Sequence, residues 1–196
     1  MERKPLIVGI GGTTRAGSSS EKALAISLRA AQAAGARTEM LGSAALDLPM
    51  YAPERPERSP AASRLVGLLR ECDGVIIASP AYHGSISGLV KNALDYTEDL
   101  RADARVYLDG RAAGLIGCGA GWQGAGQTLA ALRAIAHSLR AWPTPLGAAL
   151  NTALPLFDAD GACKDDAVLF QLETVGRQVT EFARMRMALE QETVAG

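Results

Sequence analysis

Residues 6–20 read LIVGIGGTTRAGSSS. The apolar run at 6–10 is typical of a buried strand, and glycines follow at the point where that strand should end. Leu24, Leu28 and Ala31 then recur at helical spacing. A strand, a glycine-rich turn and a helix in succession predict the first unit of an α/β fold.

The same alternation of apolar runs and helical patterns continues along the chain. Further strands are expected at 38–41, 75–79, 112–118 and 144–149, and further helices near 65–72, 87–99, 129–139 and 169–182. Five strands separated by helices imply a parallel sheet covered on both faces, because parallel strands need crossover connections. We predict a single domain spanning residues 1–196.

Composition narrows the class of partner. Twenty basic and twenty-one acidic side chains leave a formal charge of −1, so no overall field favours nucleic acid or an anionic membrane surface. The three cysteines are far apart and lack a metal-ligand spacing, which favours a reducing, cytoplasmic setting without a bound metal. No apolar run approaches the roughly 20 residues that span a bilayer. We expect a small-molecule partner.

The first loop carries an unusual set of polar side chains. Its hydroxyl groups belong to Thr13, Thr14, Ser18, Ser19 and Ser20, and Arg15 lies among them. Hydroxyl donors beside a guanidinium suit a terminal phosphate monoester, which gains from charge-assisted hydrogen bonds. The alternative is that these residues only cap the following helix; one of them is expected to do so.

Two other phosphate-binding motifs compete for the first loop. A Walker loop is excluded because it requires Gly-Lys-Ser/Thr, and no lysine lies between Lys4 and Lys22. A dinucleotide fingerprint is closer, since Gly9 and Gly11 have the required spacing. Pyrophosphate is bound mainly by backbone amides and the helix dipole, however, and does not account for Arg15 and the hydroxyl groups.

Two more loops follow strands of the predicted sheet, where ligands of such sheets bind. Residues 79–88 read SPAYHGSISG and offer fixed backbone with one aromatic ring; the alternative is an ordinary turn. Residues 117–126 read GCGAGWQGAG. This glycine density favours close approach of a ligand or partner to the backbone; the alternative is simple flexibility.

With these loops placed, the chain resembles the NADPH-dependent FMN reductase family of flavodoxin-like proteins, which includes azo, quinone and chromate reductases. Residues 12–20 align with the family pattern Gly-Ser-x-Arg-x-x-Ser-x-Asn, and 80–85 with Pro-x-Tyr-Asn-x-Ser, followed by Lys-Asn-Ala-Leu-Asp at 91–95. The resemblance implies a sheet of order 2-1-3-4-5. It implies the following FMN-binding residues: Thr13, Arg15, Ser18, Ser20, Pro80, Ala81, Tyr82, His83, Gly84, Ser85, Gly119, Ala120, Gly121, Trp122, Gln123 and Gly124.

The resemblance also implies an activity. It indicates an NAD(P)H oxidoreductase that passes hydride to FMN and then to free flavin, a quinone, or an azo or nitro compound, with no side chain needed as a catalytic acid or base. A homodimer or homotetramer is expected. The alternatives are a flavodoxin-type electron carrier, against which the charge of −1 argues, and a non-catalytic flavin-binding regulatory module.

Two points stay open at this stage. His83 replaces the family's asparagine, so it either hydrogen-bonds near the flavin or stacks at the mouth of the site. The choice between NADH and NADPH is also open, because Arg55, Arg58 and Arg111 either meet a 2′-phosphate or only water.

Overall fold

A computed structural model describes residues 3–195 of the chain, with side chains described as far as residue 192. The strands are β1 (Leu6–Gly11), β2 (Arg37–Leu41), β3 (Gly74–Tyr82), β4 (Ser85–Ile86), β5 (Ala112–Gly119), β6 (Trp142–Pro143) and β7 (Ala148–Asn151). The helices are α1 (Ser19–Ala33), α2 (Pro60–Glu71), α3 (Gly88–Asp95), α4 (Trp122–Ser138) and α5 (Asp166–Ala195), with 3₁₀ turns η1 (Ser43–Leu46) and η2 (Tyr96–Leu100).

The sheet is parallel along its main path, in the order β2-β1-β3-β5-β6. Register is continuous from β1 to β3, with Ile10 beside Ile77, and from β3 to β5, with Ile76 beside Gly114. The predicted class, a doubly wound flavodoxin-like α/β sheet, is confirmed. The carboxyl ends of these parallel strands lie at one edge of the sheet. The three loops predicted to bind a ligand begin at that edge.

The predicted count of five strands is wrong, because the sheet has seven. The run at 144–149 is not one strand: β6 and β7 both pair with β5, and the chain between them leaves the ladder. Pro145 lies in the interruption and has no N–H to donate to the ladder. The other addition is β4, which pairs antiparallel with β3 in a hairpin.

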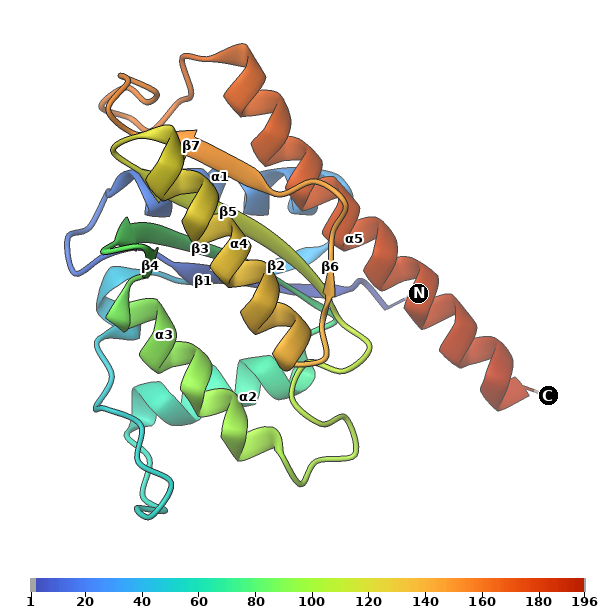
Figure 1. Cartoon of the computed structure of the whole chain (residues 1–196). Coiled ribbons are helices and arrows are strands. Elements are labelled where there is room, and N and C mark those ends of the chain that lie inside the picture. Colours follow the sequence, from blue (N-terminus) through green and yellow to red (C-terminus); the bar gives the residue numbers. More distant parts are fainter. Residues whose placement is uncertain (1–2, 196) are drawn as a thin grey trace.

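Helices cover the sheet on both faces (Figure 1). α1 and α5 lie on one face, where Leu24, Leu172 and Val175 join a buried cluster. The helices α2, α3 and α4 lie on the other face, with Leu65 and Val90 in a second cluster. The two cores hold the strands rigidly, so the loops at the carboxyl edge project from a fixed scaffold. No helix within residues 3–195 is long and apolar enough to cross a membrane.

Candidate functional site

The carboxyl edge of the sheet gathers four segments into one continuous surface. The Gly12 N–H lies 3.4 Å from the Ala78 carbonyl and links the first loop to β3. Pro80 lies beside Cys118 in register, which aligns the second loop with the third. The Thr152 N–H donates to Gly119 O at 2.7 Å and adds the segment after β7. The three predicted loops are therefore brought together, and a fourth segment joins them.

Glycine is required twice in the turn out of β1. A Cβ on Gly11 would collide with the backbone of Ala78, so the close approach of β1 to β3 needs glycine there. Gly12 has a φ of 123°, which side-chain-bearing residues rarely adopt. The Thr13 hydroxyl then donates to Arg15 O at 3.0 Å and accepts from the Arg15 N–H at 3.1 Å. This local turn presents the Arg15 side chain outward.

The serines after Arg15 divide between structural and exposed roles. Ser18 caps α1, as its Oγ accepts from the Glu21 N–H at 3.3 Å, so the expected cap is confirmed. Ser18 and Ser20 are both buried, and their hydroxyl oxygens lie 3.3 Å apart. Ser19 is the serine that faces the neighbouring hollow. Ser19 was among the hydroxyl groups noted in the sequence but not among the predicted binding residues.

Glu21, in the first turn of α1, fixes the shape of the first loop. Its carboxylate accepts from the Gly17 N–H at 2.5 Å, from the Ser43 N–H at 3.3 Å and from the Ser43 hydroxyl at 2.9 Å. One side chain thereby ties the loop after β1 to the turn after β2. The loop is preorganised by the protein's own contacts, which lowers the entropic cost of binding a ligand there.

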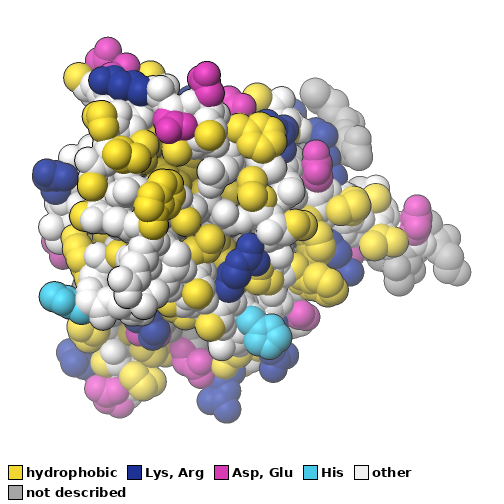
Figure 2. Space-filling model, turned by 45° about the horizontal axis from the view of Figure 1, so that its top comes forward, with side chains coloured by type: hydrophobic (Ala, Val, Ile, Leu, Met, Phe, Trp, Pro, Cys, Tyr) yellow, Lys and Arg dark blue, Asp and Glu magenta, His cyan; other side chains and the backbone are white. Residues whose placement is uncertain are grey.

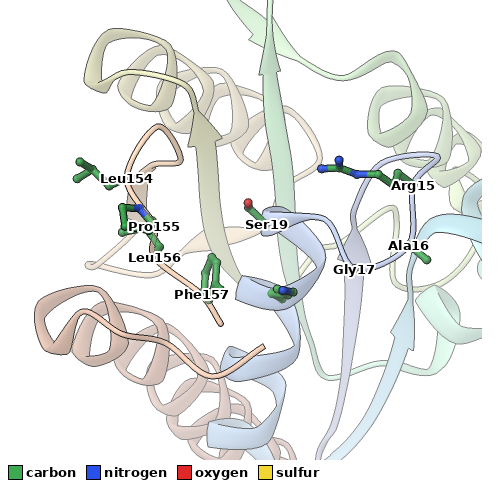
Figure 3. Close-up of a pocket in the computed structure, with 9 residues that line it drawn as sticks. Arg15, Ala16, Gly17, Ser19, Leu154, Pro155, Leu156 and Phe157 are labelled. Carbon is green, nitrogen blue, oxygen red and sulfur yellow. The ribbon is translucent and has the colours of Figure 1, made fainter. Parts of the chain in front are cut away.

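A hollow of about 470 Å³ lies beside the first turn of α1. Figure 3 shows Arg15 extending from the first loop toward the side of Ser19, with residues 154–157 across the gap. Lys22 also lines the hollow, and its ammonium donates to Asp158 O at 2.7 Å. Two cations, a hydroxyl group and a helix N-terminus together make a site suited to a phosphate.

The apolar wall of this hollow, Leu154, Pro155, Leu156 and Phe157, was missed in the sequence. These residues lie just beyond β7, whereas the predicted binding residues lie in the loops after the first, third and fourth expected strands. Their position after the last strand of the sheet was the available signal.

The second loop is a tight β3–β4 hairpin rather than an open loop. His83 and Gly84 occupy the turn with φ values of 50° and 88°, the pattern of a type I′ turn. Asparagine and histidine tolerate this conformation better than most residues, which explains why His83 stands where the family has asparagine. Tyr82 is 50% exposed at the hairpin. Pro80, Ala81 and Ser85 complete the hairpin within the same carboxyl edge.

The third loop is shorter than predicted, because α4 already begins at Trp122. Gly119 ends β5, Ala120 and Gly121 form the turn, and Trp122, Gln123 and Gly124 form the first turn of the helix. The third loop approaches the second closely: a Cβ added to Gly124 would lie 3.4 Å from the Ala81 Cβ. Trp122 is 62% exposed beside it.

Helix packing explains part of the glycine density in this loop. A Cβ on Gly119 would lie 2.6 Å from Ala125 N, and one on Gly117 would lie 2.5 Å from Ala125 O. Both glycines are therefore needed for α4 to approach β5. The interpretation that a ligand or partner must approach the backbone is not required at these two positions. Gly121 and Gly126 face open space.

A strap formed by residues 47–59 follows the turn after β2 and is held on α3. Asn92, 8% exposed, accepts from the Tyr51 N–H at 2.8 Å and donates to Pro49 O at 3.0 Å. The Tyr96 hydroxyl also donates to Pro49 O, at 2.9 Å. Asn92 belongs to the Lys-Asn-Ala-Leu-Asp segment, so this residue of the motif has a structural role: it holds the strap against α3. These contacts leave Met50 75% exposed.

The three arginines considered for a 2′-phosphate differ in their availability. Arg58 pairs with Asp99 through two bonds of 2.7 and 2.8 Å and lies over the Tyr51 ring. These hydrogen bonds lower the pKa of Asp99. Arg111 is 1% exposed and donates to Cys72 O, Tyr107 O and Arg70 O, so it is structural. Arg55 alone remains exposed.

A family model described as "NADPH-dependent FMN reductase" matches residues 5–154, which span β1 to the segment after β7. The chain belongs to the NADPH-dependent FMN reductase family. Within this family, the first loop and the β3–β4 hairpin are the segments that carry its motifs in the present sequence, and the structure places both at one edge.

Curated relatives of this FMN reductase family member are azoreductases. The chain is 39% identical over 59 residues to an NADPH azoreductase of Bacillus sp. (strain OY1-2), with 30% of this chain and 33% of the relative covered. It is 35% identical over 102 residues to an FMN-dependent NADPH-azoreductase of Staphylococcus saprophyticus, with 52% and 47% covered. The matched segments span less than half the length of these relatives.

Solved structures extend the likeness in fold over nearly the whole chain. FerB from Paracoccus denitrificans, described as a flavoenzyme NAD(P)H:(acceptor) oxidoreductase, superposes with a TM-score of 0.75 at 20% identity, covering 93% of this chain and 98% of FerB. The NADH:FMN oxidoreductase EMOB gives a TM-score of 0.67 at 21% identity, with 93% and 90% covered. These likenesses show the fold of the FMN reductase family.

Proposed function

We propose that the chain is an FMN-dependent NAD(P)H oxidoreductase that reduces a second, small-molecule acceptor. The membership of the NADPH-dependent FMN reductase family over residues 5–154 carries this proposal. Bound FMN would supply the chemistry by accepting hydride from the nicotinamide and passing electrons to a free flavin, a quinone, or an azo or nitro compound. The azoreductase names of the curated relatives favour an azo compound among these.

The donor set at the carboxyl edge fits a flavin mononucleotide. Arg15, Lys22 and Ser19 would bind the terminal phosphate at the N-terminus of α1. The hairpin residues Pro80, Ala81, Tyr82, His83, Gly84 and Ser85, and the third-loop residues Gly119, Ala120, Gly121, Trp122, Gln123 and Gly124, would bind the ring. Thr13, Ser18 and Ser20 would shape the phosphate loop, since their hydroxyl groups already have partners within it.

The residues of this chain would act by position rather than by proton transfer. The hairpin and the turn before α4 would offer backbone N–H groups to the ring and stabilise negative charge on it. The exposed Tyr82 and Trp122, at the hairpin and at the start of α4, would exclude water from the ring. No catalytic acid, base or metal is proposed.

We also propose a homodimer or homotetramer in the cytoplasm. The exposed apolar side chains around the carboxyl edge support an interface there. The apolar face of α4 packs into the core instead. The three cysteines, Cys72, Cys118 and Cys163, are free thiols, which supports a reducing compartment.

The electron-carrier alternative is weakened by the surface charge. Figure 2 shows basic and acidic side chains interspersed on the face in view, without a field of one sign. A carrier steered to a protein partner would benefit from such a field.

The test is FMN titration of the purified chain followed by steady-state oxidation of NADH and NADPH with a panel of acceptors. We expect saturable FMN binding and acceptor-dependent oxidation of a nicotinamide. A chain that binds no FMN and oxidises neither nicotinamide with any acceptor would overturn the proposal. Flavin bound without turnover would instead support the regulatory module.

A further inference from the structure

Ser79 lies in β3 directly before the residues that form the β3–β4 hairpin. It opens the stretch SPAYHGSISG, and neither the sequence motifs nor the proposed ligand contacts give it a role. Its side chain is fully buried, although serine is mostly an exposed residue. A buried hydroxyl finds its hydrogen-bond partners within the protein, so the partners of Ser79 indicate its role.

The Ser79 hydroxyl joins the two ends of the hairpin. It donates to Pro80 O at 2.9 Å and accepts from the Ser87 N–H at 2.9 Å. The hairpin register ends with Ala81 beside Ile86. Pro80 and Ser87 stand opposite each other at the next rung, the base of the hairpin, and the hydroxyl bridges them there. One serine side chain therefore closes the hairpin at its base.

The end of the hairpin is also the start of α3. Ser87 is the N-cap of α3 and is 2% exposed, and its hydroxyl oxygen accepts from the Val90 N–H at 3.2 Å. The hydrogen bond from the Ser87 N–H to Ser79 is buried. Loss of the Ser79 hydroxyl would leave that N–H without this partner, which is costly away from water. Ser79 therefore couples the hairpin to the fixed N-terminus of α3.

A second buried hydroxyl holds the hairpin from the side of α4. Thr128 is fully buried and its hydroxyl donates to Ser85 O at 3.3 Å. A threonine inside a helix often bonds to the carbonyl four residues before it, as Thr180 does with Gly176 O at 3.0 Å. Thr128 instead bonds across to the second strand of the hairpin. The hairpin is thus held both at its base and along one side.

We propose that Ser79, assisted by Thr128, is a positioning residue for the flavin ring and acts through the hairpin that it closes. This inference rests on the proposed function, in which residues 80–85 bind the ring. A two-stranded hairpin is marginally stable on its own, and β4 has only two residues. The direction of the turn at His83 and Gly84 therefore depends on what holds the base of the hairpin.

Positioning of this kind affects the reaction through the bound flavin. Backbone groups that are held in place need no reorganisation when negative charge develops on the ring. A hairpin without its closing hydroxyl would sample several directions, so both the affinity for FMN and the reduction potential of the flavin would change. Ser79 acts without touching the ring, because its side chain has no exposed surface.

Hydrogen exchange of the flavin-free protein tests whether Ser79 closes the hairpin. Ser79→Ala should raise the exchange rates of the amides of residues 81–87 about tenfold, because the hairpin opens more readily. The matched control is Ser27→Ala, since Ser27 is equally buried and its hydroxyl donates to Leu172 O at 2.7 Å between α1 and α5. That variant should leave exchange at residues 81–87 unchanged. Equal exchange there in both variants would overturn the proposal.

Flavin readouts separate a positioning role from a merely structural one. Ser79→Ala should weaken FMN binding about tenfold and should shift both the visible absorbance and the midpoint potential of the bound flavin. Ser27→Ala should change none of these, and Ser79→Thr, which keeps the hydroxyl, should restore them. Unchanged FMN affinity and midpoint potential in Ser79→Ala, despite faster exchange of the hairpin, would overturn the proposal.

A second pair of variants decides if circular dichroism shows that Ser79→Ala does not fold. Thr128→Val removes the other hydroxyl that holds the hairpin, and Thr180→Val is its control, because both threonines are fully buried in helices. Only Thr128→Val should speed exchange at residues 81–87 and alter the flavin. An unchanged protein that binds no FMN would overturn the proposed function and this role in it. Normal FMN binding with unaltered hairpin exchange in the variants would overturn this inference alone.

Discussion

The side-chain amide of Asn92 holds Tyr51, accepting from its backbone N–H at 2.8 Å while donating to the carbonyls of Leu48 and Pro49. A single buried side chain on α3 thus fixes the backbone of a segment 41 residues away in the chain. The segment carries Met50, which is 75% exposed. Asn92 therefore fixes the path of the strap over α3.

We expect Asn92→Ala to lower the free energy of unfolding by about 1–3 kcal/mol, because it leaves the partly buried Tyr51 N–H unpaired. Urea unfolding measures this. FMN affinity should change little. Gln127→Ala is the matched control, since it removes an exposed amide on α4. Equal stability of the two variants would contradict the role of Asn92.

Arg15→Ala should weaken FMN binding roughly 10- to 150-fold, the equivalent of about 1.5–3 kcal/mol for hydrogen bonds to a charged group. Fluorescence titration with FMN measures the affinity. Riboflavin, which has no phosphate, should bind the variant and the unchanged protein equally. The control is Arg101→Ala, an exposed arginine in the segment after η2. Unchanged FMN affinity of Arg15→Ala would remove Arg15 from the site.

Two glycines near the third loop should respond in opposite directions to alanine. Gly117→Ala is expected to destabilise the protein by about 1–3 kcal/mol, since the new Cβ would lie 2.5 Å from Ala125 O and force α4 outward. Gly126→Ala should stabilise it by about 0.5–1 kcal/mol, because Gly126 lies inside α4 with open space around it. Thermal unfolding of the pair checks both. A stable Gly117→Ala variant would refute the packing argument.

His83→Asn should leave stability and FMN affinity nearly unchanged, because both residues tolerate a φ of 50°. His83→Val should destabilise the hairpin, since a β-branched residue is strained there. Chemical unfolding compares the two. A large loss of FMN affinity in His83→Asn with full stability would show instead that the imidazole contacts the cofactor.

Low pH should weaken the ion pair between Arg58 of the strap and Asp99 of η2. The Arg58 hydrogen bonds lower the pKa of Asp99 below its ordinary value of 3.8. The pair therefore stabilises the fold fully above that value, and the contribution is lost as pH falls through the lower, folded-state pKa. Asp99→Asn should flatten the fall in unfolding free energy below about pH 4. An identical pH profile for the variant and the unchanged protein would contradict this.

Much of the fold could be predicted because the relevant physics is local. Apolar runs bounded by glycine identified β1, β3 and β5, and serines before helical patterns marked the start of α1 and α3, which Ser18 and Ser87 cap. The expected strand at 144–149 is divided because Pro145, inside that run, has no N–H to donate to the ladder. β4 is two residues long, and so short a strand leaves no periodic signal.

The loops that form the candidate site could be predicted from the sequence, but the contacts between residues of different loops could not. Residue types singled out Arg15 and the loop that contains His83 and Gly84, although not that this loop is a hairpin. Lys22 and residues 154–157 were not, because their proximity to Arg15 arises only when α1 and the segment after β7 meet across the sheet edge. Arg111 looked available for a ligand, and only the fold reveals that three backbone carbonyls surround it.

The central proposal is direct reduction of bound FMN by a nicotinamide. Rapid anaerobic mixing of FMN-loaded protein with NADPH or NADH, followed through the visible absorbance of the flavin, tests it most directly. We predict that the flavin absorbance bleaches without any other protein and returns when an azo compound or a quinone is added. Flavin that stays oxidised with both nicotinamides, and bleaches only after a separate reductase protein is supplied, would contradict the proposal and identify an electron carrier.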